Sequence, residues 1–343
     1  MNLGLSEDQL AIEEAFTRLF VRESPTAVVR AAEPLGFDRG VWDRLVDMGA
    51  PGMGVASESG GGGGAMLSDL VVVAEAVGRA IAPVPLIEHM VAARAHPVDD
   101  VVEGASIATI SLRPARPDGT WRLVPAGAIA DVVIGVDGDE LVAVRSPAPG
   151  EAPRNHAAAP IADRSARVGE RTVLGPAGDF ARPLGEWKTL TSAALVGISA
   201  ASLQLGRDYA MSRYQFGVPI GSFQAVQHGL ADLPALIDGA RLLTHKAAWS
   251  GDQPAPGICN VDDADITDFD CLAGMAFVFA AETATRSTDR SLHFHGGYGF
   301  SEEYDIQLYY RRARGWALVF DDPSKECLRL ADGLFGPVTA GAA

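Results

Sequence analysis

Cysteine, lysine and long apolar runs are scarce in this chain of 343 residues. The three cysteines, Cys259, Cys271 and Cys327, form no CxxC pair and are odd in number, so they suggest neither a disulfide framework nor a zinc site. So few cysteines, without a paired spacing, fit the reducing cytoplasm, where we expect the protein to be located. The first residues contain no basic stretch followed by an apolar one, so we expect no signal peptide.

The longest uncharged stretch that could suggest a membrane span is residues 189–206, which contain six Thr, Ser or Gln side chains. This composition favours a buried helix over a membrane span. Positive charge is also limited, since 28 Lys and Arg face 44 Asp and Glu and leave a formal net charge of −16. Repulsion then opposes binding to nucleic acid or to an anionic membrane, whereas local arginines can still hold a small anion.

The first part of the chain shows helical patterns. Ser6 and Gln9 form a capping-box signature before an apolar face, and further helices are predicted at about 40–49 and 66–80. Five glycines occupy positions 60–64 between these two helices. We interpret them as a loop because no strand precedes them and no Lys follows, with a phosphate cradle as the alternative.

Apolar periodicity changes from 3.6 to short β-rich runs between about 103 and 176, which predicts a small antiparallel sheet or partial barrel. Helical patterns return after Pro183. We expect a helix rich in small side chains at 189–212, a helix at 224–249 with a kink at Pro234, and a helix at 266–290 that follows a run of acidic residues. The predicted fold is therefore mainly α, with an N-terminal helical domain (1–102), a shortened β domain (103–182) and a C-terminal helical bundle (183–343). The acidic residues before the last helix are Asp262, Asp263, Asp265 and Asp268.

Two C-terminal motifs combine anion-binding chemistry with backbone freedom. RYQFGVPIGSFQAVQHGLAD begins at Arg213, whose guanidinium can donate several hydrogen bonds to a phosphate. HFHGGYGF begins at His293, and its Gly296 and Gly297 let backbone amides approach a phosphate or ribose. Pairing of Arg213 with a surface carboxylate is the alternative. His293 and His295 lack a third ligand at suitable spacing, so no metal site is predicted.

Together with LSEDQLAIEEAF, GVASESGGGG and VVVAEAVGRAIAPVPL near the N-terminus, these motifs resemble the acyl-CoA dehydrogenase family over most of the chain. The resemblance implies an N-terminal helical domain, a β domain and a C-terminal four-helix bundle, with FAD as cofactor. It also implies that the His293 loop serves the FAD of a neighbouring subunit, although a Gln usually occupies that position. The implied cofactor-binding residues are Arg213 for phosphate, Gln215 and Phe216 for flavin, Gln224 for adenosine, and His293, Gly296 and Gly297.

In this family a carboxylate removes the α-proton of an acyl-CoA while the β-hydrogen leaves as hydride to the flavin. The resemblance places the base at one of two positions, and these hold Phe320 and Trp187 here. Neither is acidic. A shift of one residue supplies Asp321 or Glu186 as candidate catalytic residues.

The sheet departs further from the family, because TISLRPARPDG carries Arg113 where an acidic residue is expected and no Gly-Ser-Asp loop follows. The chain therefore resembles the short subunits of heteromeric α2β2 acyl-CoA dehydrogenases of actinobacterial steroid and fatty acid degradation. This implies a longer dehydrogenase subunit as partner, an acyl-CoA substrate and electron-transfer flavoprotein as acceptor. The alternatives are a self-sufficient homotetrameric dehydrogenase, a non-catalytic scaffold, and an oxidase or monooxygenase on the same fold.

Overall fold

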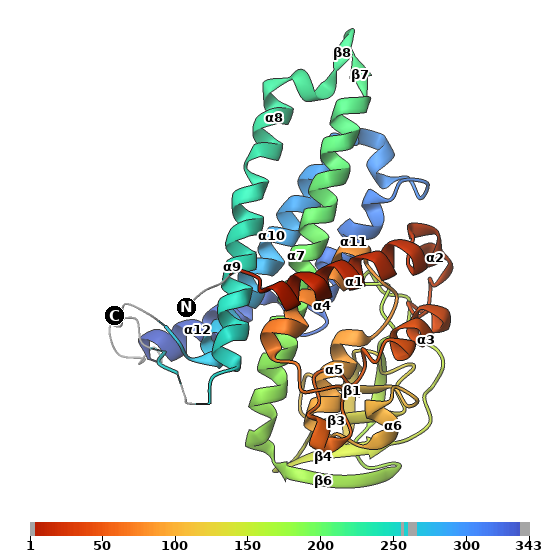
Figure 1. The fold of residues 1–343 in the computed structure, drawn as a ribbon, viewed down its shortest axis with the longest axis vertical. Coiled ribbons are helices and arrows are strands. Elements are labelled where there is room, and N and C mark those ends of the chain that lie inside the picture. The colour runs from red at the N-terminus through yellow and green to blue at the C-terminus, as the bar shows by residue number, and fades with distance from the viewer. Residues whose placement is uncertain (1–3, 255–256, 260–265, 337–343) are drawn as a thin grey trace.

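The computed structural model describes residues 4–254, 257–259 and 266–336. Helices come first, a small sheet region follows, and a long helical bundle completes the chain (Figure 1). This is the mainly α layout, with helices, a small sheet region and a helical bundle, that the sequence predicted. The first helices are α1 Glu7–Glu23, α2 Thr26–Ala31, α3 Arg39–Asp47, η1 Ser57–Ser59, α4 Leu67–Ala80, α5 Leu86–Ala95 and α6 Asp99–Val102.

The predicted start of α1 is confirmed by its hydrogen bonds. The backbone N–H of Gln9 donates to Ser6 Oγ at 3.2 Å, and the Ser6 N–H donates to Gln9 Oε1 at 3.0 Å. This reciprocal pair satisfies two N–H groups that the helix itself leaves free.

The glycine stretch is a loop that folds back on residues 52–56. Gly61 N donates to Ala56 O, Gly62 N to Gly52 O, and Gly64 N to Val55 O, all within 3.1 Å. A Cβ atom at Gly61 would lie 2.2 Å from Val55 O, so close backbone packing requires glycine there. Because these amides already have partners, the phosphate-cradle alternative loses its donors.

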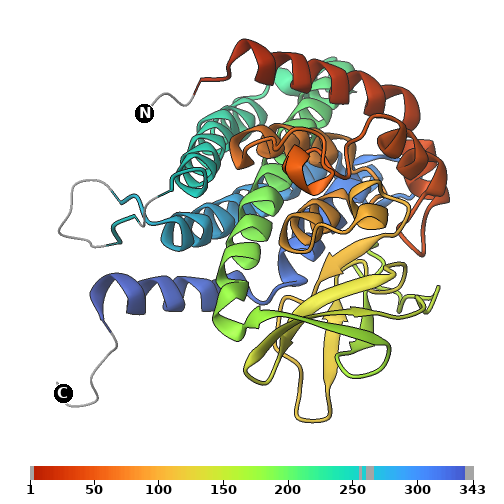
Figure 2. The same cartoon turned by 60° about the horizontal axis from the view of Figure 1, so that its bottom comes forward.

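Six strands make up the sheet region, β1 to β6. Four form one sheet in the order β1-β3-β4-β6, and β2 pairs with β5. Figure 2 shows the strands gathered on one side of the helices. The prediction of a small antiparallel sheet holds for the β3–β4, β4–β6 and β2–β5 pairs but was wrong for β1, which runs parallel to β3. The connection between them, which includes β2, is long enough for the crossover that parallel strands need. The strands are β1 Ala108–Ile110, β2 Thr120–Val124, β3 Val132–Asp137, β4 Glu140–Arg145, β5 Ala162–Ser165 and β6 Glu170–Pro176.

The bundle consists of α7, the consecutive pair α8 and α9, α10 and α11, with α12 attached beside it. Pro183 lies within the first turn of α7, where a missing N–H is tolerated, so the helix begins earlier than predicted. The helix predicted over 224–249 is interrupted at Asp232, and Pro234 stands in the first turn of α9. The bounds are η2 Ala177–Phe180, α7 Ala181–Ser212, β7 Tyr214–Gln215, β8 Val218–Pro219, η3 Ile220–Ser222, α8 Gln224–Ala231, α9 Leu233–Gly251, α10 Phe269–Phe294, η4 Gly296–Phe300, α11 Ile306–Leu318 and α12 Pro323–Phe335.

Helix α7 is the central element of the body, and the predicted buried helix at 189–206 is confirmed. The segment Ala177–Ser212 is long and apolar enough to span a membrane by length and composition alone, but 72% of its most apolar window is buried inside the protein. Small residues let α7 approach α4 closely, since a Cβ at Gly78 would lie 1.8 Å from Ala194 O and one at Gly197 would lie 2.1 Å from Glu75 O.

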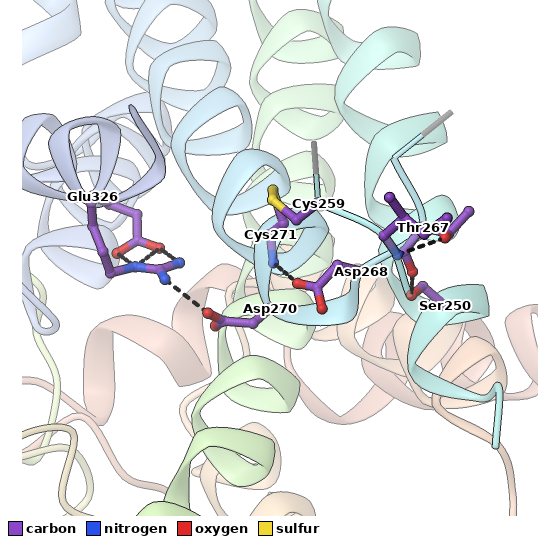
Figure 3. Close-up of a disulfide and its surroundings, with 9 residues drawn as sticks. Ser250, Cys259, Thr267, Asp268, Asp270, Cys271 and Glu326 are labelled. Atoms are coloured by element: carbon purple, nitrogen blue, oxygen red, sulfur yellow. Dashed lines mark hydrogen bonds and ion pairs between the residues drawn. A yellow bond between two sulfur atoms is a disulfide. The ribbon is translucent and has the colours of Figure 1, made fainter. Parts of the chain in front are cut away.

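The start of α10 corrects the cysteine prediction, because Cys259 and Cys271 form a disulfide (Figure 3). Twelve positions separate them in sequence, yet the backbone N–H groups of Thr267 and Asp268 both donate to Ile258 O and bring the two segments together. The spacing of the cysteines along the chain and their odd number carry no information about this tertiary contact. Asp268 caps α10 by accepting from Cys271 N at 2.8 Å, whereas Asp262, Asp263 and Asp265 lie outside the described residues.

Candidate functional site

The RYQFG motif forms a hairpin at the end of α7. Arg213 is the C-cap of that helix, and β7 and β8 then pair around a two-residue turn of Phe216 and Gly217. Both turn residues have positive φ, 52° and 82°, which suits glycine but costs a phenylalanine roughly 1–2 kcal/mol. The Phe216 side chain is nevertheless 93% exposed. An exposed ring on a strained turn is typical of a surface that contacts another molecule.

The HFHGGYGF motif forms the turn after α10. His295 is the C-cap, η4 follows, and Gly296 adopts a left-handed φ of 60°. A Cβ atom at Gly296 or Gly297 would meet none of the described atoms within 4 Å. The space beside this backbone is therefore open to a ligand.

The tertiary structure brings these two motifs together at one end of the bundle. The guanidinium carbon of Arg213 lies 5.6 Å from the centre of the Tyr298 ring. Arg213 makes no ion pair with any carboxylate in the part of the chain that the structure describes, so the alternative of a surface salt bridge finds no partner there. We call the hairpin of residues 213–219 and the loop of residues 295–300 the clamp.

The remaining cofactor candidates also lie at the clamp end. Gln224 is the first residue of α8 and is exposed. Gln215 is exposed and donates from Nε2 to Tyr214 O at 2.8 Å. His293, exposed in the last turn of α10, lies edge-on to Phe294. All are accessible to a ligand held at the clamp.

The clamp and the sheet stand at opposite ends of the molecule (Figure 1). Helix α7 connects them, and its 32 residues span roughly 48 Å at 1.5 Å per residue. This length exceeds that of a dinucleotide cofactor. One FAD molecule therefore cannot place its phosphates in this clamp and its ring on the sheet of the same chain.

Three side chains fill the sheet side of the body, and we call Arg113, Trp187 and Phe320 the plug. The Arg113 guanidinium donates to the carbonyl oxygen of Phe320. The rings of Trp187 and Phe320 lie 6.1 Å apart, and both pack against the buried Phe277 at 5.8 Å. The two positions where the family carries its base are thus aromatic and in mutual contact.

The cavity beside Trp187 is small, at about 70 Å³, where ligand pockets usually measure ~300–1,000 Å³. It is lined by α4, α5, the sheet region, α7 and α11, and its walls are mainly apolar. Glu88 faces this cavity and accepts a long hydrogen bond, 3.4 Å, from Trp187 Nε1. Burial raises the pKa of Glu88 above its ordinary value.

The two candidate bases point elsewhere. Glu186 lies one residue from Trp187, so its side chain turns by about 100° around α7 and meets Arg94 and Arg182 instead. Asp321 accepts from Lys325 Nζ at 3.0 Å, and hydrogen bonds from Asp322 N–H and Lys325 lower its pKa. Both carboxylates are ion-paired, and neither lines the cavity beside Trp187.

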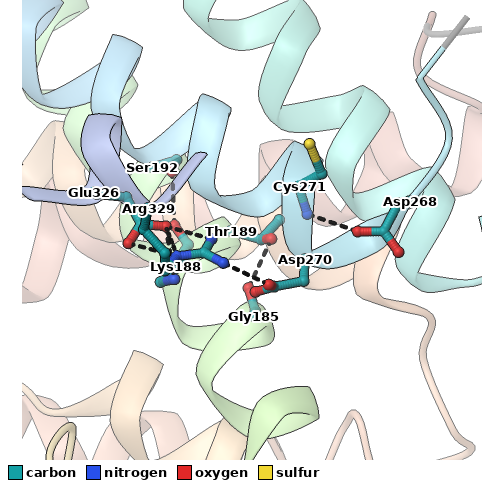
Figure 4. Close-up of polar contacts among 9 residues, drawn as sticks. All are labelled: Gly185, Lys188, Thr189, Ser192, Asp268, Asp270, Cys271, Glu326 and Arg329. Carbon is teal, nitrogen blue, oxygen red and sulfur yellow. Dashed lines mark hydrogen bonds and ion pairs between the residues drawn. The ribbon is translucent and has the colours of Figure 1, made fainter. Parts of the chain in front are cut away.

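A buried ion pair of Lys188 and Glu326 is shown in Figure 4. It adjoins the plug, because Lys188 Nζ lies 5.1 Å from the centre of the Phe320 ring. Lys188 Nζ lies 2.8 Å from Glu326 Oε1, and both side chains are at most 2% exposed. Burial lowers the pKa of Lys188, and although burial opposes ionisation of Glu326 as well, hydrogen bonds from Arg329 and Lys188 outweigh it and lower the pKa of Glu326. Arg329 extends the network to Asp270 at 2.8 Å and so links α12 to α7 and α10.

The fold and these motifs define a class of flavin-dependent dehydrogenases. The sequence profiles of "Acyl-CoA dehydrogenase, N-terminal domain" and "Acyl-CoA dehydrogenase, C-terminal domain" match residues 6–98 and 181–319. The chain is 31% identical to acyl-CoA dehydrogenase IpdE2 of Mycolicibacterium smegmatis over 96% of this chain and 100% of that protein. The chain therefore belongs to the acyl-CoA dehydrogenase family.

Other relatives narrow the comparison. Acyl-CoA dehydrogenase FadE27 of Mycobacterium tuberculosis is 31% identical, with 81% of this chain and 83% of that protein covered. A solved structure of the Tcur3481-Tcur3483 steroid dehydrogenase, G363A variant, superposes with a TM-score of 0.82 at 26% identity, covering 96% of this chain and 98% of that chain. The ChsE4-ChsE5 complex of Mycobacterium tuberculosis superposes at 0.85 and 24% identity, over 99% and 100%, and supports the fold.

FAD is the cofactor of this family, and the two ends of the chain fit it unequally. The clamp offers a guanidinium without an acidic partner among the described residues and an open glycine backbone, which suit a diphosphate. On the sheet side, the cavity beside Trp187 has a volume of about 70 Å³, which does not suit a flavin ring. Sequence reasoning missed Glu88, Tyr298 and the Arg113–Phe320 contact. Of these, only Glu88 had a signal in the sequence, because it is the single carboxylate in the apolar helix of residues 86–95.

Proposed function

We propose that this chain is the short subunit of a heteromeric FAD-dependent acyl-CoA dehydrogenase that introduces an α,β double bond into an acyl-CoA thioester. Its clamp binds the diphosphate half of an FAD whose ring lies on a longer partner subunit. The opposite placement of clamp and sheet supports a second subunit, because one FAD cannot reach both ends of this chain. The aromatic side chains at both base positions of this chain favour a partner that is unlike it.

In this arrangement FAD, when bound, accepts the β-hydrogen of the acyl group as hydride. The chain's own residues do the binding. Arg213 donates hydrogen bonds to phosphate oxygens, and the open backbone at Gly296 and Gly297 admits the ribose or phosphate. Gln224 and the exposed Phe216 contact the cofactor and the partner. The partner supplies the base, because the plug fills both base positions here.

The relatives support the heteromeric type and a role in steroid degradation. We further propose that the chain acts in the cytoplasm and that its acyl-CoA substrate carries a lipid or steroid side chain. The Tcur3481-Tcur3483 protein is described as a steroid acyl-CoA dehydrogenase, and ChsE4-ChsE5 as a complex. Electron-transfer flavoprotein is the acceptor we propose. The alternative of a self-sufficient homotetramer is disfavoured by the ion-paired states of Glu186 and Asp321.

The test is to purify the chain alone and together with the full-length acyl-CoA dehydrogenase encoded nearest to it. We expect no tightly bound FAD in the isolated chain and one FAD per pair of unlike subunits in the complex, with acyl-CoA-dependent dye reduction only in the complex. Stoichiometric FAD and full activity in the isolated chain contradict the proposal. A complex that forms without any flavin indicates the non-catalytic scaffold.

Arg213→Ala should weaken FAD binding by the complex, since a charge-assisted hydrogen bond contributes about 1.5–3 kcal/mol. Arg207→Ala is the matched control, because Arg207 is exposed on the same helix but pairs with Asp208 at 2.9 Å. Equal effects of the two substitutions would show that charge near α7, and not the clamp, binds the cofactor. The measurement is the FAD dissociation constant by flavin fluorescence.

A further inference from the structure

A group of four rings lies at the clamp end, two of them within the clamp loop, and none of the four belongs to the main apolar core. Tyr298 packs against Tyr304 with ring centres 5.2 Å apart, and Tyr304 lies edge-on to His295 at 6.1 Å. His295 is stacked on Tyr209 at 4.2 Å with an interplanar angle of 21°. We call Tyr209, His295, Tyr298 and Tyr304 the aromatic stack. It connects the end of α7 to the end of α10.

The aromatic stack is anchored at its buried end. His295 is 6% exposed, and its Nδ1–H donates to Ser291 O at 2.7 Å. Burial lowers the pKa of His295 despite that bond, which favours the neutral ring with a fixed tautomer. Tyr209 precedes Arg213 by one helical turn and accepts the Arg213 N–H through its carbonyl oxygen at 2.8 Å. Rigid elements therefore hold the rings from both sides.

At its exposed end the aromatic stack presents the Tyr298 ring to Arg213. A ring attracts the face of a guanidinium, whereas a carboxylate takes up the N–H groups on its edge. Arg94 illustrates the second case, since its Nε, Nη1 and Nη2 all donate to Glu186 or to backbone carbonyls. Tyr298 thus restrains the Arg213 side chain and leaves its hydrogen-bond donors available.

We propose that Tyr298, supported by the aromatic stack, is the positioning residue that orients Arg213 for the diphosphate of FAD. Restraining Arg213 before binding lowers the entropy that ordering a long side chain would otherwise cost. The same stack fixes the hairpin and the glycine loop relative to each other, which makes two distant motifs one site. This inference rests on the proposed function, because it assigns a role within the same clamp.

The test compares two substitutions in the complex with the full-length partner. Tyr298→Phe keeps the ring and should leave the FAD dissociation constant within about twofold. Tyr298→Leu keeps apolar bulk but removes the ring, and should weaken FAD binding by about 3- to 30-fold, the range of an exposed to a desolvated cation–π contact. Flavin fluorescence gives the constants, and thermal unfolding of the isolated chain should be alike for both variants.

A double-mutant cycle distinguishes positioning from a general effect on the loop. In an Arg213→Ala background, Tyr298→Leu should cause no further loss of FAD affinity. An equal loss in both backgrounds, or no loss with Tyr298→Leu while Arg213→Ala weakens binding, overturns the inference and leaves the proposed function standing. If Arg213→Ala itself leaves FAD affinity unchanged, both fail.

Discussion

Trp187 and Phe320 determine, at the scale of single residues, what the body of this protein can bind. Each stands where the family's base is expected, their rings are in contact, and Phe320 also accepts a hydrogen bond from Arg113 through its carbonyl oxygen. Glu186 is adjacent in sequence to Trp187, yet it faces two arginines on another side of the helix. Side-chain direction, and not sequence proximity, excludes it from the cavity.

Asp321→Asn and Glu186→Gln should leave the turnover rate per bound FAD unchanged in the complex, within about twofold, because the proposed base belongs to the partner. Dye reduction by an acyl-CoA, normalised to flavin content, is the measurement. Loss of activity with FAD retained in either variant would identify that residue as a base and restore the self-sufficient alternative.

His89 should make folding stability sensitive to acid. It is fully buried, its Nε2–H donates to Val101 O, and its Nδ1 accepts from Ala108 N. Burial lowers its pKa to about 4, so below pH ~6.5 only the unfolded chain takes up a proton. The His89 contribution is complete above that pH and falls by up to about 3 kcal/mol as pH approaches 4.

Urea unfolding at several pH values measures this slope. His89→Gln is the matched control, because an amide can donate and accept at the same places without titrating. It should flatten the dependence between pH 6.5 and 4. An unchanged slope in the variant would assign the acid sensitivity to other groups, such as the ion-paired carboxylates.

At the scale of elements, the body is held together by close helix contacts and one buried network. Helix α12 has few buried apolar residues and docks mainly through Glu326, which meets Lys188 of α7 and Arg329 of its own turn. Helices α4 and α7 cross at Gly78 and Gly197, where backbone meets backbone. These contacts position the plug, including Trp187.

Lys188→Met should destabilise the chain by about 3 kcal/mol, because it leaves Glu326 buried with Arg329 as its main cation. Lys325→Met on α12 is the matched control, since its partner Asp321 is partly exposed and such a pair contributes less than about 1 kcal/mol. Chemical denaturation gives both values. Similar losses of stability in the two variants would mean that the buried Lys188–Glu326 pair is not a structural contact of α12.

Gly197→Ala should cost at least about 2 kcal/mol, because the added methyl group would lie 2.1 Å from Glu75 O and neither backbone can yield easily. Gly333→Ala is the opposite case within α12, where the new Cβ meets none of the described atoms within 4 Å. It should raise stability by about 0.5–1 kcal/mol through helix propensity. A stabilising Gly197→Ala would contradict the close crossing of α4 and α7.

At the scale of the whole molecule, exposed apolar side chains concentrate at the clamp end. Seven of the large apolar side chains that are exposed belong to this end, namely Met211, Tyr214, Phe216, Val218, Phe223, Tyr298 and Phe300. An apolar aromatic surface next to an anion-binding arginine suits a protein partner that also holds the cofactor.

Phe216→Asp should prevent assembly with the longer subunit, because losing an aromatic anchor at an interface weakens association by about 30-fold or more. The isolated chain should remain folded, since the side chain is 93% exposed and Asp tolerates a positive φ better than Phe. Val21→Asp on α1, 75% exposed, is the control and should assemble normally. Light scattering after size-exclusion chromatography gives the oligomeric state, and normal assembly of the Phe216 variant would contradict the interface.

The sequence by itself determined the order of helices and strands, the cap at Ser6, and the residue types of the clamp, because these depend on local periodicity and on chemistry at single positions. It did not determine the parallel pairing of β1, the Cys259–Cys271 disulfide or the direction of Glu186. Only the tertiary structure decided that Arg213 meets Tyr298, that Arg113, Phe320 and Trp187 come together in the plug, and that α7 separates clamp from sheet. These are contacts between residues far apart in sequence, and they arise from packing of the whole chain, which no local pattern encodes.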